Sequence, residues 1–219
     1  MFEKKLHKGV RQIMFENELN AKVNEKSYNK IVEQWDKARK QGILSELVVS
    51  FASKLIPNGS VLDIGCGTGY PIAKYLCEQN FMVTGIDVSG KMLQKAFELN
   101  LKNAEFHLCD FYDFVPEIKF DGVIAFDSFF HFPKERQSEI YEKVASWMKD
   151  GAYLLFTHGN EDNEKNSVMF QEPFYYSSLK TSDVHNLLYL AGFEIELSIE
   201  RYKENDIGRD LVIIAKKVK

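Results

Sequence analysis

The chain has 219 residues, of which 45% are hydrophobic and 27% are charged, as in an ordinary globular protein. This length predicts one α/β domain with room for an N-terminal helical extension. The 28 basic residues are outnumbered by 32 acidic ones, and the net charge of -4 lacks the basic bias that nucleic-acid-binding proteins usually carry. A local basic patch is compatible with this count, but a nucleic-acid partner is not expected.

The cysteines and the N-terminal segment point to a reducing compartment. No metal site is predicted, because metal-ligand spacing is missing from the three cysteines, Cys66, Cys77 and Cys109. The N-terminal segment lacks the continuous apolar stretch of a signal peptide, and no apolar run approaches the length of a membrane span. We therefore expect a cytoplasmic protein with buried thiols and no membrane partner.

Residues 1–56 are predicted to be helical. Apolar side chains recur there at spacings of three and four, as in Tyr28, Ile31 and Trp35, which is the period of an amphipathic helix. Pro57-Asn58-Gly59 then supplies a turn that separates this N-terminal extension from the main domain over residues 57–219.

Strands and helices alternate after that turn, which predicts a parallel sheet with helices on both faces. The strands are expected at residues 60–64, 81–86, 104–108, 120–126 and 153–157. Helices are expected from the end of the glycine loop through Leu76, over 92–99, and over 134–149 with a stop at Asp150-Gly151.

The C-terminal part breaks this alternation. A helix over residues 182–191 is followed by FEIELSIERY, in which apolar and polar side chains alternate, and then by an apolar run at 211–215. The linker between the last two segments is too short for a crossover helix, so they must pair as an antiparallel hairpin. A mostly parallel sheet that ends in a hairpin also argues against an ordinary dinucleotide dehydrogenase.

The strongest motif is the segment VLDIGCGTG, in which a strand leads into a glycine loop and a helix follows. Gly65, Gly67 and Gly69 let the backbone turn tightly and let a ligand approach main-chain N–H groups. In open parallel sheets, ligands bind beyond the carboxyl ends of the strands. Tyr70 occupies the place of the third glycine in the dinucleotide-binding pattern, which counts against a nicotinamide cofactor.

Three acidic residues lie at strand ends near this loop. Asp63 suits a ligand that carries an ammonium and a sulfonium group, or it staples the loop by accepting backbone N–H bonds. Asp87 is placed to accept both hydroxyls of an adenosine ribose, or to cap the helix that begins near Ser89. Asp110 could bond an adenine amino group while Phe111 flanks the ring, or it is a turn residue.

The segments VLDIGCGTGYPIAKYL, VTGIDVSGKMLQKA, EFHLCD and FDGVIAFDSFFHF resemble the motifs of class I S-adenosylmethionine-dependent methyltransferases in order and spacing. The resemblance covers about residues 26–217 and is closest to small bacterial methyltransferases that share GTGxPIAxYL and a D-S-x-F-H segment. It implies a three-layer Rossmann-like α/β sandwich with a seven-stranded sheet containing one antiparallel strand. It also implies S-adenosylmethionine as cofactor, S-adenosylhomocysteine as product, and a catalytic domain over residues 57–219.

The resemblance further implies the cofactor site. The glycine loop would cradle the methionine part, Asp87 would hold the ribose, and Phe126 would offer a carbonyl near the methionine end. Tyr28 and Trp35, in the extension over residues 1–56, would close over the cofactor, although their spacing fits core packing equally well. The cofactor-binding residues expected in this way are Tyr28, Trp35, Asp63, Gly65, Cys66, Gly67, Gly69, Asp87, Val88, Met92, Asp110, Phe111 and Phe126.

The catalytic residues follow less directly from the sequence. Methyl transfer mainly needs donor and acceptor to be aligned and shielded from water, and a general base is needed only if the acceptor starts protonated. The candidates are Asp127 and His131, after the fourth strand, and His158, after the fifth. For His131, between two phenylalanines, a satisfied structural histidine is the main alternative.

The segment over residues 158–180 is long for a connection between a strand and a helix, and such segments are often lids or binding loops. Its aromatic residues Phe174, Tyr175 and Tyr176 are candidates for contact with the substrate; the alternative is that they anchor the loop to the core. The motifs of base-directed amino or cytosine-C5 methylation are missing from the sequence. A small-molecule acceptor is therefore expected.

Three other functions compete with this interpretation. A non-catalytic cofactor-binding module would keep the glycine loop and Asp87 but close the acceptor pocket. A methyltransferase acting on RNA or protein would use the N-terminal helices to dock its partner. A nicotinamide-dependent oxidoreductase is the weakest of the three, because of Tyr70 and the C-terminal hairpin.

Overall fold

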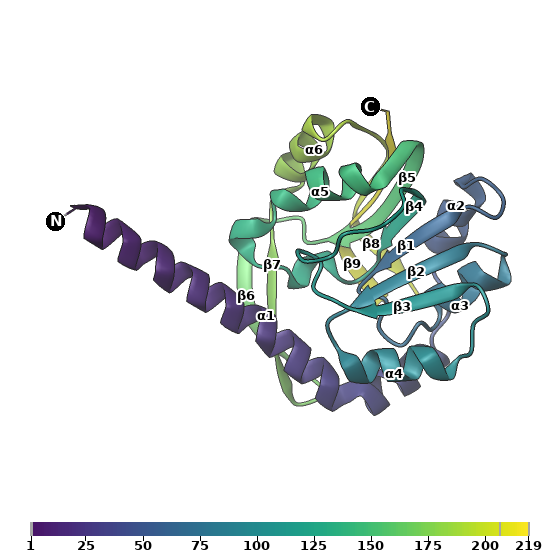
Figure 1. Ribbon diagram of the computed structural model, residues 1–219, viewed down its shortest axis with the longest axis horizontal. Helices are drawn as coiled ribbons and strands as arrows, with labels where there is room; N and C mark the ends of the chain where they lie inside the picture. The colour runs from purple at the N-terminus through teal and green to yellow at the C-terminus, as the bar shows by residue number, and fades with distance from the viewer. Residues whose placement is uncertain (1, 206, 219) are drawn as a thin grey trace.

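The computed structural model describes residues 2–205 and 207–218, with side chains from residue 22 onwards. Its centre is a seven-stranded sheet in the order β3-β2-β1-β4-β5-β9-β8 (Figure 1). The strands of this sheet are β1 (Ser60–Ile64), β2 (Met82–Asp87), β3 (Ala104–Leu108), β4 (Phe120–Ala125), β5 (Met148–His158), β8 (Phe193–Glu204) and β9 (Ile207–Lys217). The helices are α1 (Phe2–Gln41), α2 (Glu46–Lys54), α3 (Ile72–Glu78), α4 (Gly90–Glu98), η1 (Phe129–His131), η2 (Lys134–Arg136), α5 (Glu139–Trp147) and α6 (Thr181–Leu190).

The first five strands pair in parallel, and β9 runs antiparallel between β5 and β8. This arrangement confirms the predicted Rossmann-like sheet and its C-terminal hairpin. The reversal from β2 and β3 on one side of β1 to β4 and β5 on the other places a crevice at the carboxyl ends of the central strands. In open α/β sheets, ligands bind in that crevice.

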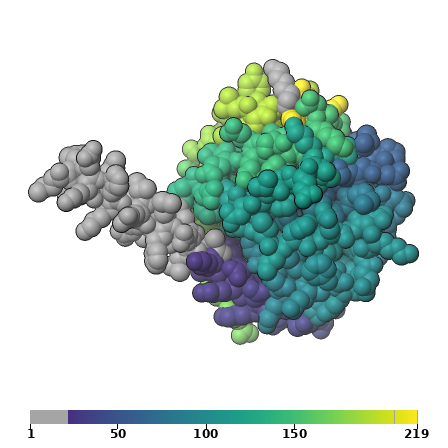
Figure 2. All heavy atoms as spheres, viewed as in Figure 1, coloured from purple at the N-terminus to yellow at the C-terminus, as the bar shows by residue number. Residues whose placement is uncertain are grey.

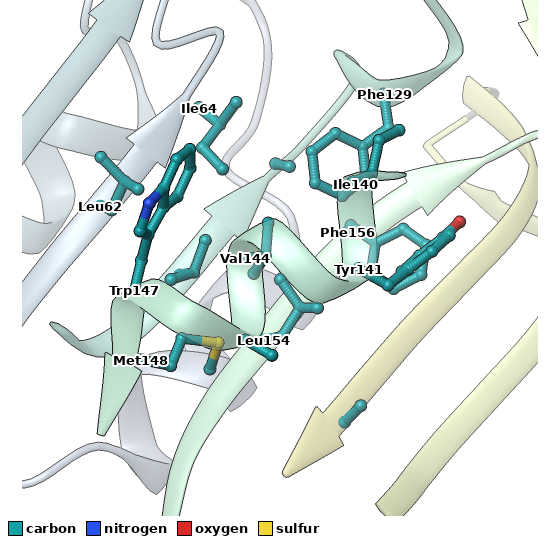
Figure 3. Packing of buried hydrophobic residues seen from close by; sticks show 14 of the residues in the cluster. Leu62, Ile64, Phe129, Ile140, Tyr141, Val144, Trp147, Met148, Leu154 and Phe156 are labelled. Carbon is teal, nitrogen blue, oxygen red and sulfur yellow. The ribbon is translucent and has the colours of Figure 1, made fainter. Parts of the chain in front are cut away.

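Both faces of the sheet are covered, so neighbouring residues of a central strand are buried on opposite sides. Val61 packs with α2, α3 and α4, whereas Leu62 packs with α5 and α6. On the second face, Trp147 and Tyr141 of α5 pack against side chains of the strands, as Figure 3 shows. Fully burying a large apolar side chain stabilises a fold by about 1.5–3 kcal/mol, so these two clusters fix the sheet that carries the crevice.

The structure corrects two predictions about elements. The helix expected over residues 134–149 is divided into η2 and α5, and β5 already begins at Met148, so Asp150-Gly151 lies within a strand. The segment over residues 158–180 is not an irregular loop but contains a second, two-stranded sheet of β6 (Asn163–Met169) and β7 (Glu172–Ser178). Phe170 and Gln171 join these strands with positive φ angles of 51° and 68°, as in a two-residue hairpin turn.

The N-terminal helices pack in different places. α2 lies on the sheet, where Val48 and Phe51 are fully buried. α1 instead lies across β7 and α4, and its Asn29 side-chain oxygen accepts a 2.9 Å hydrogen bond from the Ser89 hydroxyl at the start of α4. Figure 2 shows α1 from residue 22 onwards, in purple, against the body of the molecule.

Gly122 in β4 lets α2 approach the sheet closely, and this contact yields a stability prediction. A Cβ atom at Gly122 would lie 2.8 Å from Leu55 Cδ2 and 3.0 Å from Phe51 Cζ. We expect Gly122→Val to lower the free energy of unfolding by about 1–3 kcal/mol, because overpacking forces neighbouring side chains off their rotamers. Urea unfolding measures the loss. Gly208→Val is the control, since no atom lies within 4 Å of a Cβ there, and equal stability of the two variants would contradict the prediction.

Candidate functional site

A cavity of about 950 Å³ opens at the carboxyl ends of the central strands, between the sheet and α1. Its wall includes residues from the glycine loop, from the ends of β2, β3 and β4, and from α1. All of the predicted cofactor residues lie on this wall except Gly69. The structure therefore places on one cavity wall the residues that separate sequence motifs assigned to the cofactor.

The glycine loop is tied to the end of β2. The N–H groups of Gly65 and Cys66 both donate to the Ile86 carbonyl, at 2.8 and 3.1 Å. Gly65 and Gly67 have φ angles of +73° and +55°, in the left-handed region that favours glycine. A Cβ at Gly65 would lie 2.6 Å from the Ser128 Cβ, so this position excludes any side chain. The loop thus turns tightly enough to leave the cavity open above it.

Asp87 serves the loop and lines the cavity at the same time. Its Oδ2 accepts a 2.9 Å hydrogen bond from the Gly67 N–H, and its Oδ1 accepts a 2.8 Å bond from the Ser89 N–H. The cap of α4 is Ser89 itself, whose hydroxyl accepts from the Met92 N–H. Burial raises the pKa of Asp87 to about 6. Each carboxylate oxygen has a second lone pair, so Asp87 can still receive ribose hydroxyls.

Asp63 is a buried carboxyl group without a full set of partners. Only 3% of the residue is exposed, and its Oδ2 has no hydrogen-bond partner among the described residues. Burial, followed by the charge of Asp87, raises the pKa of Asp63 to about 7, although Arg39 opposes the shift. A buried carboxylate is costly unless a positive charge compensates it. This orphaned atom on the cavity wall fits a cationic ligand such as one with a sulfonium and an ammonium group.

The opposite end of the cavity carries the residues predicted for adenine. Asp110 Oδ1 accepts a 2.7 Å hydrogen bond from the Tyr112 N–H, as in a turn, and the residue also lines the cavity. Phe111 is 3% exposed and its ring lies 4.9 Å from that of Phe132 and 5.1 Å from that of Trp147, between centroids. The aromatic wall is therefore held by the core behind it, as a flat binding surface requires.

Asp127 is held in an ion-pair cluster rather than free to act as a base. Arg209 contacts its two oxygens at 2.9 and 3.0 Å, and Arg39 Nη2 lies 3.2 Å from Oδ2. Burial alone would raise the pKa of Asp127, but the bond to Arg209 and the charges of both arginines keep it below its usual value. We interpret Asp127 as a permanent carboxylate that fixes Arg39 on the cavity wall. Arg39 was not predicted, although it follows Trp35 by one helical turn.

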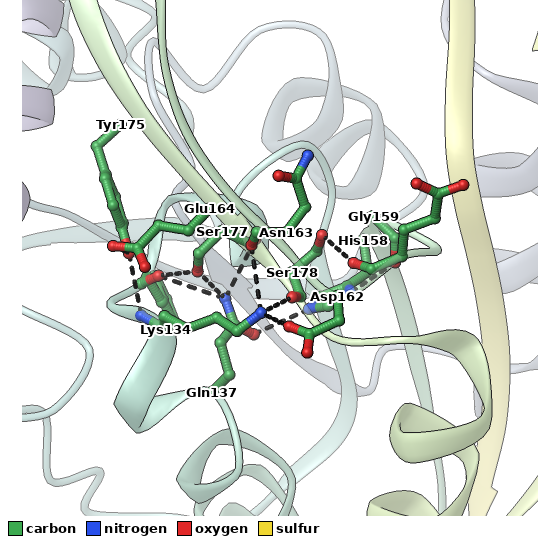
Figure 4. A network of polar contacts seen from close by, with 12 residues as sticks. Lys134, Gln137, His158, Gly159, Asp162, Asn163, Glu164, Tyr175, Ser177 and Ser178 are labelled. Atoms are coloured by element: carbon green, nitrogen blue, oxygen red, sulfur yellow. Dashed lines mark hydrogen bonds and ion pairs between the residues drawn. The ribbon is translucent and has the colours of Figure 1, made fainter.

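The two candidate histidines differ in their access to the cavity. His131 lines it, with Nε2 at 2.8 Å from the Tyr28 hydroxyl and Nδ1 at 2.9 Å from the Tyr175 carbonyl. His158 does not line it and is 2% exposed; its Nε2 lies 2.9 Å from Gln137 Oε1 within the polar network of Figure 4. Burial lowers the pKa of each histidine to about 4. His158 thus anchors the hairpin region, whereas His131 reaches the cavity wall with both ring nitrogens already in hydrogen bonds.

The predicted substrate residues lie behind the cavity wall rather than on it. Phe174 and Tyr175 of β7 are 0% and 1% exposed, and neither they nor Tyr176 line the cavity. Phe174 packs 4.8 Å from the Tyr28 ring, between centroids, and the Tyr175 N–H donates to Asn24 Oδ1 at 2.8 Å. These contacts anchor the hairpin to α1, which was the alternative interpretation. Substrate contact by the three residues stays an untested prediction.

Several residues of the wall were not predicted from the sequence. Among them are Lys22, Asn24, Glu25, Arg39, Tyr112, Phe132 and Arg136. Arg136 stacks over Tyr112, with its Cζ 3.4 Å from the ring centroid, and pairs with Glu139. No motif marks these positions. The helical spacing that links Lys22, Glu25, Tyr28, Trp35 and Arg39 is the one signal that could have placed part of them on a common face.

Comparisons with known proteins identify the family of the chain. A family model described as a methyltransferase domain matches residues 61–151. Ribosomal RNA small subunit methyltransferase G of Methylobacillus flagellatus is 31% identical over 139 residues, which cover 56% of this chain and 67% of that protein. A longer relative, botryococcene C-methyltransferase of Botryococcus braunii, is 31% identical, and the match covers 51% of this chain but 31% of the relative.

Solved structures show the same fold. The DhpI–S-adenosylhomocysteine complex superimposes with a TM-score of 0.70 at 20% identity, covering 91% of this chain and 97% of the other. Magnesium protoporphyrin IX methyltransferase from Synechocystis PCC 6803, solved with bound S-adenosylmethionine, gives 0.70 at 20% identity and covers 90% and 97%. The chain therefore belongs to the class I S-adenosylmethionine-dependent methyltransferases. The predicted family, fold class and methyl donor are confirmed. No helix in the part of the chain that the structure describes is long and apolar enough to cross a membrane.

The raised pKa of Asp63 predicts that the free energy of unfolding of the cofactor-free protein depends on pH. The folded state holds the carboxyl proton up to a pKa of about 7, whereas the unfolded chain loses it near pH 4. Stability therefore falls as the pH rises from about 4 to about 7, and the loss stays constant above that range. We expect Asp63→Asn to be more stable than wild type by about 1–4 kcal/mol near pH 8, with a smaller difference near pH 5. Urea unfolding at both pH values measures this.

The same Asp63→Asn substitution should weaken S-adenosylmethionine binding in calorimetry, because the cation loses its counter-charge. A variant with the same stability as wild type at both pH values, or with unchanged affinity, would show that Asp63 does not carry this cost for the ligand.

For Asp87, we expect two effects of one substitution. Asp87→Ala should weaken cofactor binding by about 2–4 kcal/mol, because hydrogen bonds to charged groups contribute about 1.5–3 kcal/mol each. It should also lower the melting temperature, because the bonds from Gly67 and Ser89 are lost. Calorimetry and thermal unfolding measure the two effects, with the exposed Asp210→Ala as control. A lower melting temperature with unchanged affinity would leave Asp87 a structural role alone.

Proposed function

We propose that this methyltransferase acts on a small-molecule acceptor. The main support is the size and continuity of the cavity, which runs from the glycine loop to His131 and Phe132 and measures about 950 Å³. Pockets for a single small ligand start at about 300 Å³. The cavity is therefore large enough for the cofactor and a second small molecule side by side.

Each residue of the site has its own role in the proposed reaction. Bound S-adenosylmethionine supplies a methyl carbon that is already activated by its sulfonium. Asp63 would balance the positive charge, Asp87 would hold the ribose, and Phe111 would pack against the adenine. Trp35 and Tyr28, whose rings lie 5.6 Å apart between centroids, would cover the cofactor and exclude water. What the protein adds is alignment and shielding, which together can lower the barrier of a two-reactant step by several kcal/mol.

The N-terminal helix and the β6–β7 hairpin are part of the proposal. α1 supplies cavity residues from Lys22 to Arg39, and β7 packs against it through Asn24 and Ser27, whose hydroxyl donates to the Pro173 carbonyl at 2.6 Å. We infer that residues 1–56 include the cover of the site and that the hairpin moves with α1 as a lid. A cytoplasmic location also belongs to the proposal, supported by the three free cysteines.

Two other functions compete with small-molecule methylation, and a test must distinguish them from it. The name of the Methylobacillus flagellatus relative keeps small-subunit ribosomal RNA as a candidate acceptor, although the net charge of -4 does not favour a polyanion. A non-catalytic binding module would need a cavity closed beyond the cofactor. The continuation of the cavity to His131 argues against such closure.

The test is to bind S-adenosylmethionine in a calorimeter and then to measure S-adenosylhomocysteine release with a panel of acceptors. The panel should hold phenols, alcohols, amines and thiols, with small-subunit ribosomal RNA alongside and Asp87→Ala as the cofactor-deficient control. We expect micromolar cofactor affinity, negligible binding of nicotinamide dinucleotides, and turnover with at least one small molecule. Turnover with RNA alone, or cofactor binding without any turnover, would contradict the proposal.

A further inference from the structure

Tyr28 and His131 form a hydrogen-bonded pair whose direction is fixed by the surrounding backbone. His131 Nδ1 lies 2.9 Å from the Tyr175 carbonyl oxygen, which can only accept, so Nδ1 carries the imidazole proton. His131 Nε2 therefore presents a lone pair, and the Tyr28 hydroxyl at 2.8 Å donates to it. Asn24 holds the Tyr175 backbone in place, since its amide nitrogen donates to the same carbonyl at 3.0 Å and its oxygen accepts from the Tyr175 N–H. That amide nitrogen also lies 3.2 Å from His131 Nδ1, but the carbonyl is nearer to Nδ1 and cannot donate, so the carbonyl decides the tautomer.

Because the Tyr28 hydroxyl donates to His131, its oxygen remains free to accept a hydrogen bond. A tyrosine hydroxyl has one proton to donate and two lone pairs. The Tyr28 hydroxyl already uses its proton in the hydrogen bond to His131 Nε2. Within residues 22–205 and 207–218, no second hydrogen bond to the Tyr28 hydroxyl is formed. Tyr28 and His131 both line the cavity, and the Tyr28 ring contacts Trp35, which faces Gly67 of the cofactor loop. The oxygen of Tyr28 is thus available to a molecule that sits beside the cofactor.

Building on the proposed methyl transfer, we propose that Tyr28 and His131 act as a proton relay for acceptors that carry a hydroxyl or amine hydrogen. The acceptor atom forms a bond to the methyl carbon while the carbon–sulfur bond breaks and its electron pair stays on sulfur. The acceptor hydrogen passes to the oxygen of Tyr28 as the Tyr28 proton passes to His131 Nε2. His131 becomes a cation, stabilised by the Tyr175 carbonyl at Nδ1, and later releases its proton to water.

The surroundings favour transfer through Tyr28 rather than a lasting charge on it. Burial raises the pKa of the Tyr28 hydroxyl, and the neighbouring Tyr176 and the carboxylates of Asp87 and Asp127 raise it further, against a lowering by Arg39. Burial lowers the pKa of His131 to about 4, although the Tyr175 carbonyl and Asp127 oppose the shift. His131 is therefore neutral above about pH 5 and can accept a proton, and this capacity is lost as the pH falls through about 4.

The pair is held by parts of the chain that are far apart in sequence. The His131 ring lies between the rings of Phe130 and Tyr176, each 4.8 Å away between centroids, and Tyr28 packs against Phe174. These contacts fix both side chains before a substrate arrives. A relay needs this rigidity, because proton transfer requires heavy atoms within about 2.6–3.2 Å of each other.

The kinetic test compares Tyr28→Phe with Tyr141→Phe. Tyr141 is a matched control, since it is a buried tyrosine that lies on the second face of the sheet and whose hydroxyl has no hydrogen-bond partner in the described part of the chain. With hydroxyl or amine acceptors we expect Tyr28→Phe to lose at least about 100-fold in kcat, while Tyr141→Phe keeps wild-type kcat. With a thiol assayed above its own pKa, where no proton must be removed, Tyr28→Phe should keep most of its kcat. Its affinity for S-adenosylhomocysteine should stay within about threefold of wild type, because the ring remains.

A second measurement tests the relay without any acceptor. Nitrogen-15 NMR of histidine-labelled protein, with His131→Asn used to assign the signal, should show a neutral His131 that is protonated at Nδ1 at neutral pH. Protonation at Nε2 would overturn the relay whatever the acceptor is. An equal kcat of Tyr28→Phe and wild type with hydroxyl and amine acceptors would also overturn it, as would a wild-type enzyme that methylates ionised thiols alone. Cofactor binding without any turnover would instead contradict the proposed function, and the NMR result would still decide the tautomer.

Discussion

The attachment of the glycine loop to the end of β2 is the constraint on which the rest of the site depends. Two successive N–H groups, those of Gly65 and Cys66, donate to the Ile86 carbonyl, and the next residue along the loop, Gly67, donates to Asp87. The parallel pairing of β1 with β2 sets this contact, because Ile64 lies opposite Ile86. The loop is therefore fixed by sheet register before any ligand binds, and the cavity above it keeps its shape.

Two carboxylates on the same cavity wall show how environment divides their roles. Asp127 is surrounded by Arg39, Arg209 and the Thr157 hydroxyl, so its charge is fully compensated and its pKa is lowered. Asp63 is more deeply buried than Asp127 and has an oxygen without a partner among the described residues, and burial raises its pKa to about 7. The charge of Asp127 is paired within the fold, whereas the unpaired oxygen of Asp63 is the one that we propose a cationic ligand to compensate. A protein that binds a sulfonium donor and releases a neutral thioether can use this difference to favour donor over product.

The proposed acceptor end is assembled by long-range contacts. Tyr28 comes from α1, His131 follows β4, and the carbonyl that sets the histidine tautomer belongs to Tyr175 of the hairpin. Apart from the Phe130 ring beside His131, the contacts described above for these three residues come from distant parts of the chain. Because Asn24 joins α1 to that same hairpin residue, any movement of the cover would also change the hydrogen bonding of His131.

The sequence by itself determined the alternating strands and helices, the C-terminal hairpin and the cofactor loop. These features depend on local signals, such as hydrophobic period, linker length and the glycines of VLDIGCGTG. Only the tertiary structure revealed the β6–β7 hairpin, because every residue of β6 before Met169 is exposed and its polar sequence carries no apolar alternation. It also decided that Tyr175 packs behind the wall while His131 reaches the cavity. Contacts such as that of Tyr28 with His131 join residues more than a hundred positions apart in the sequence. They depend on how α1 crosses the hairpin, and no local sequence pattern encodes that crossing.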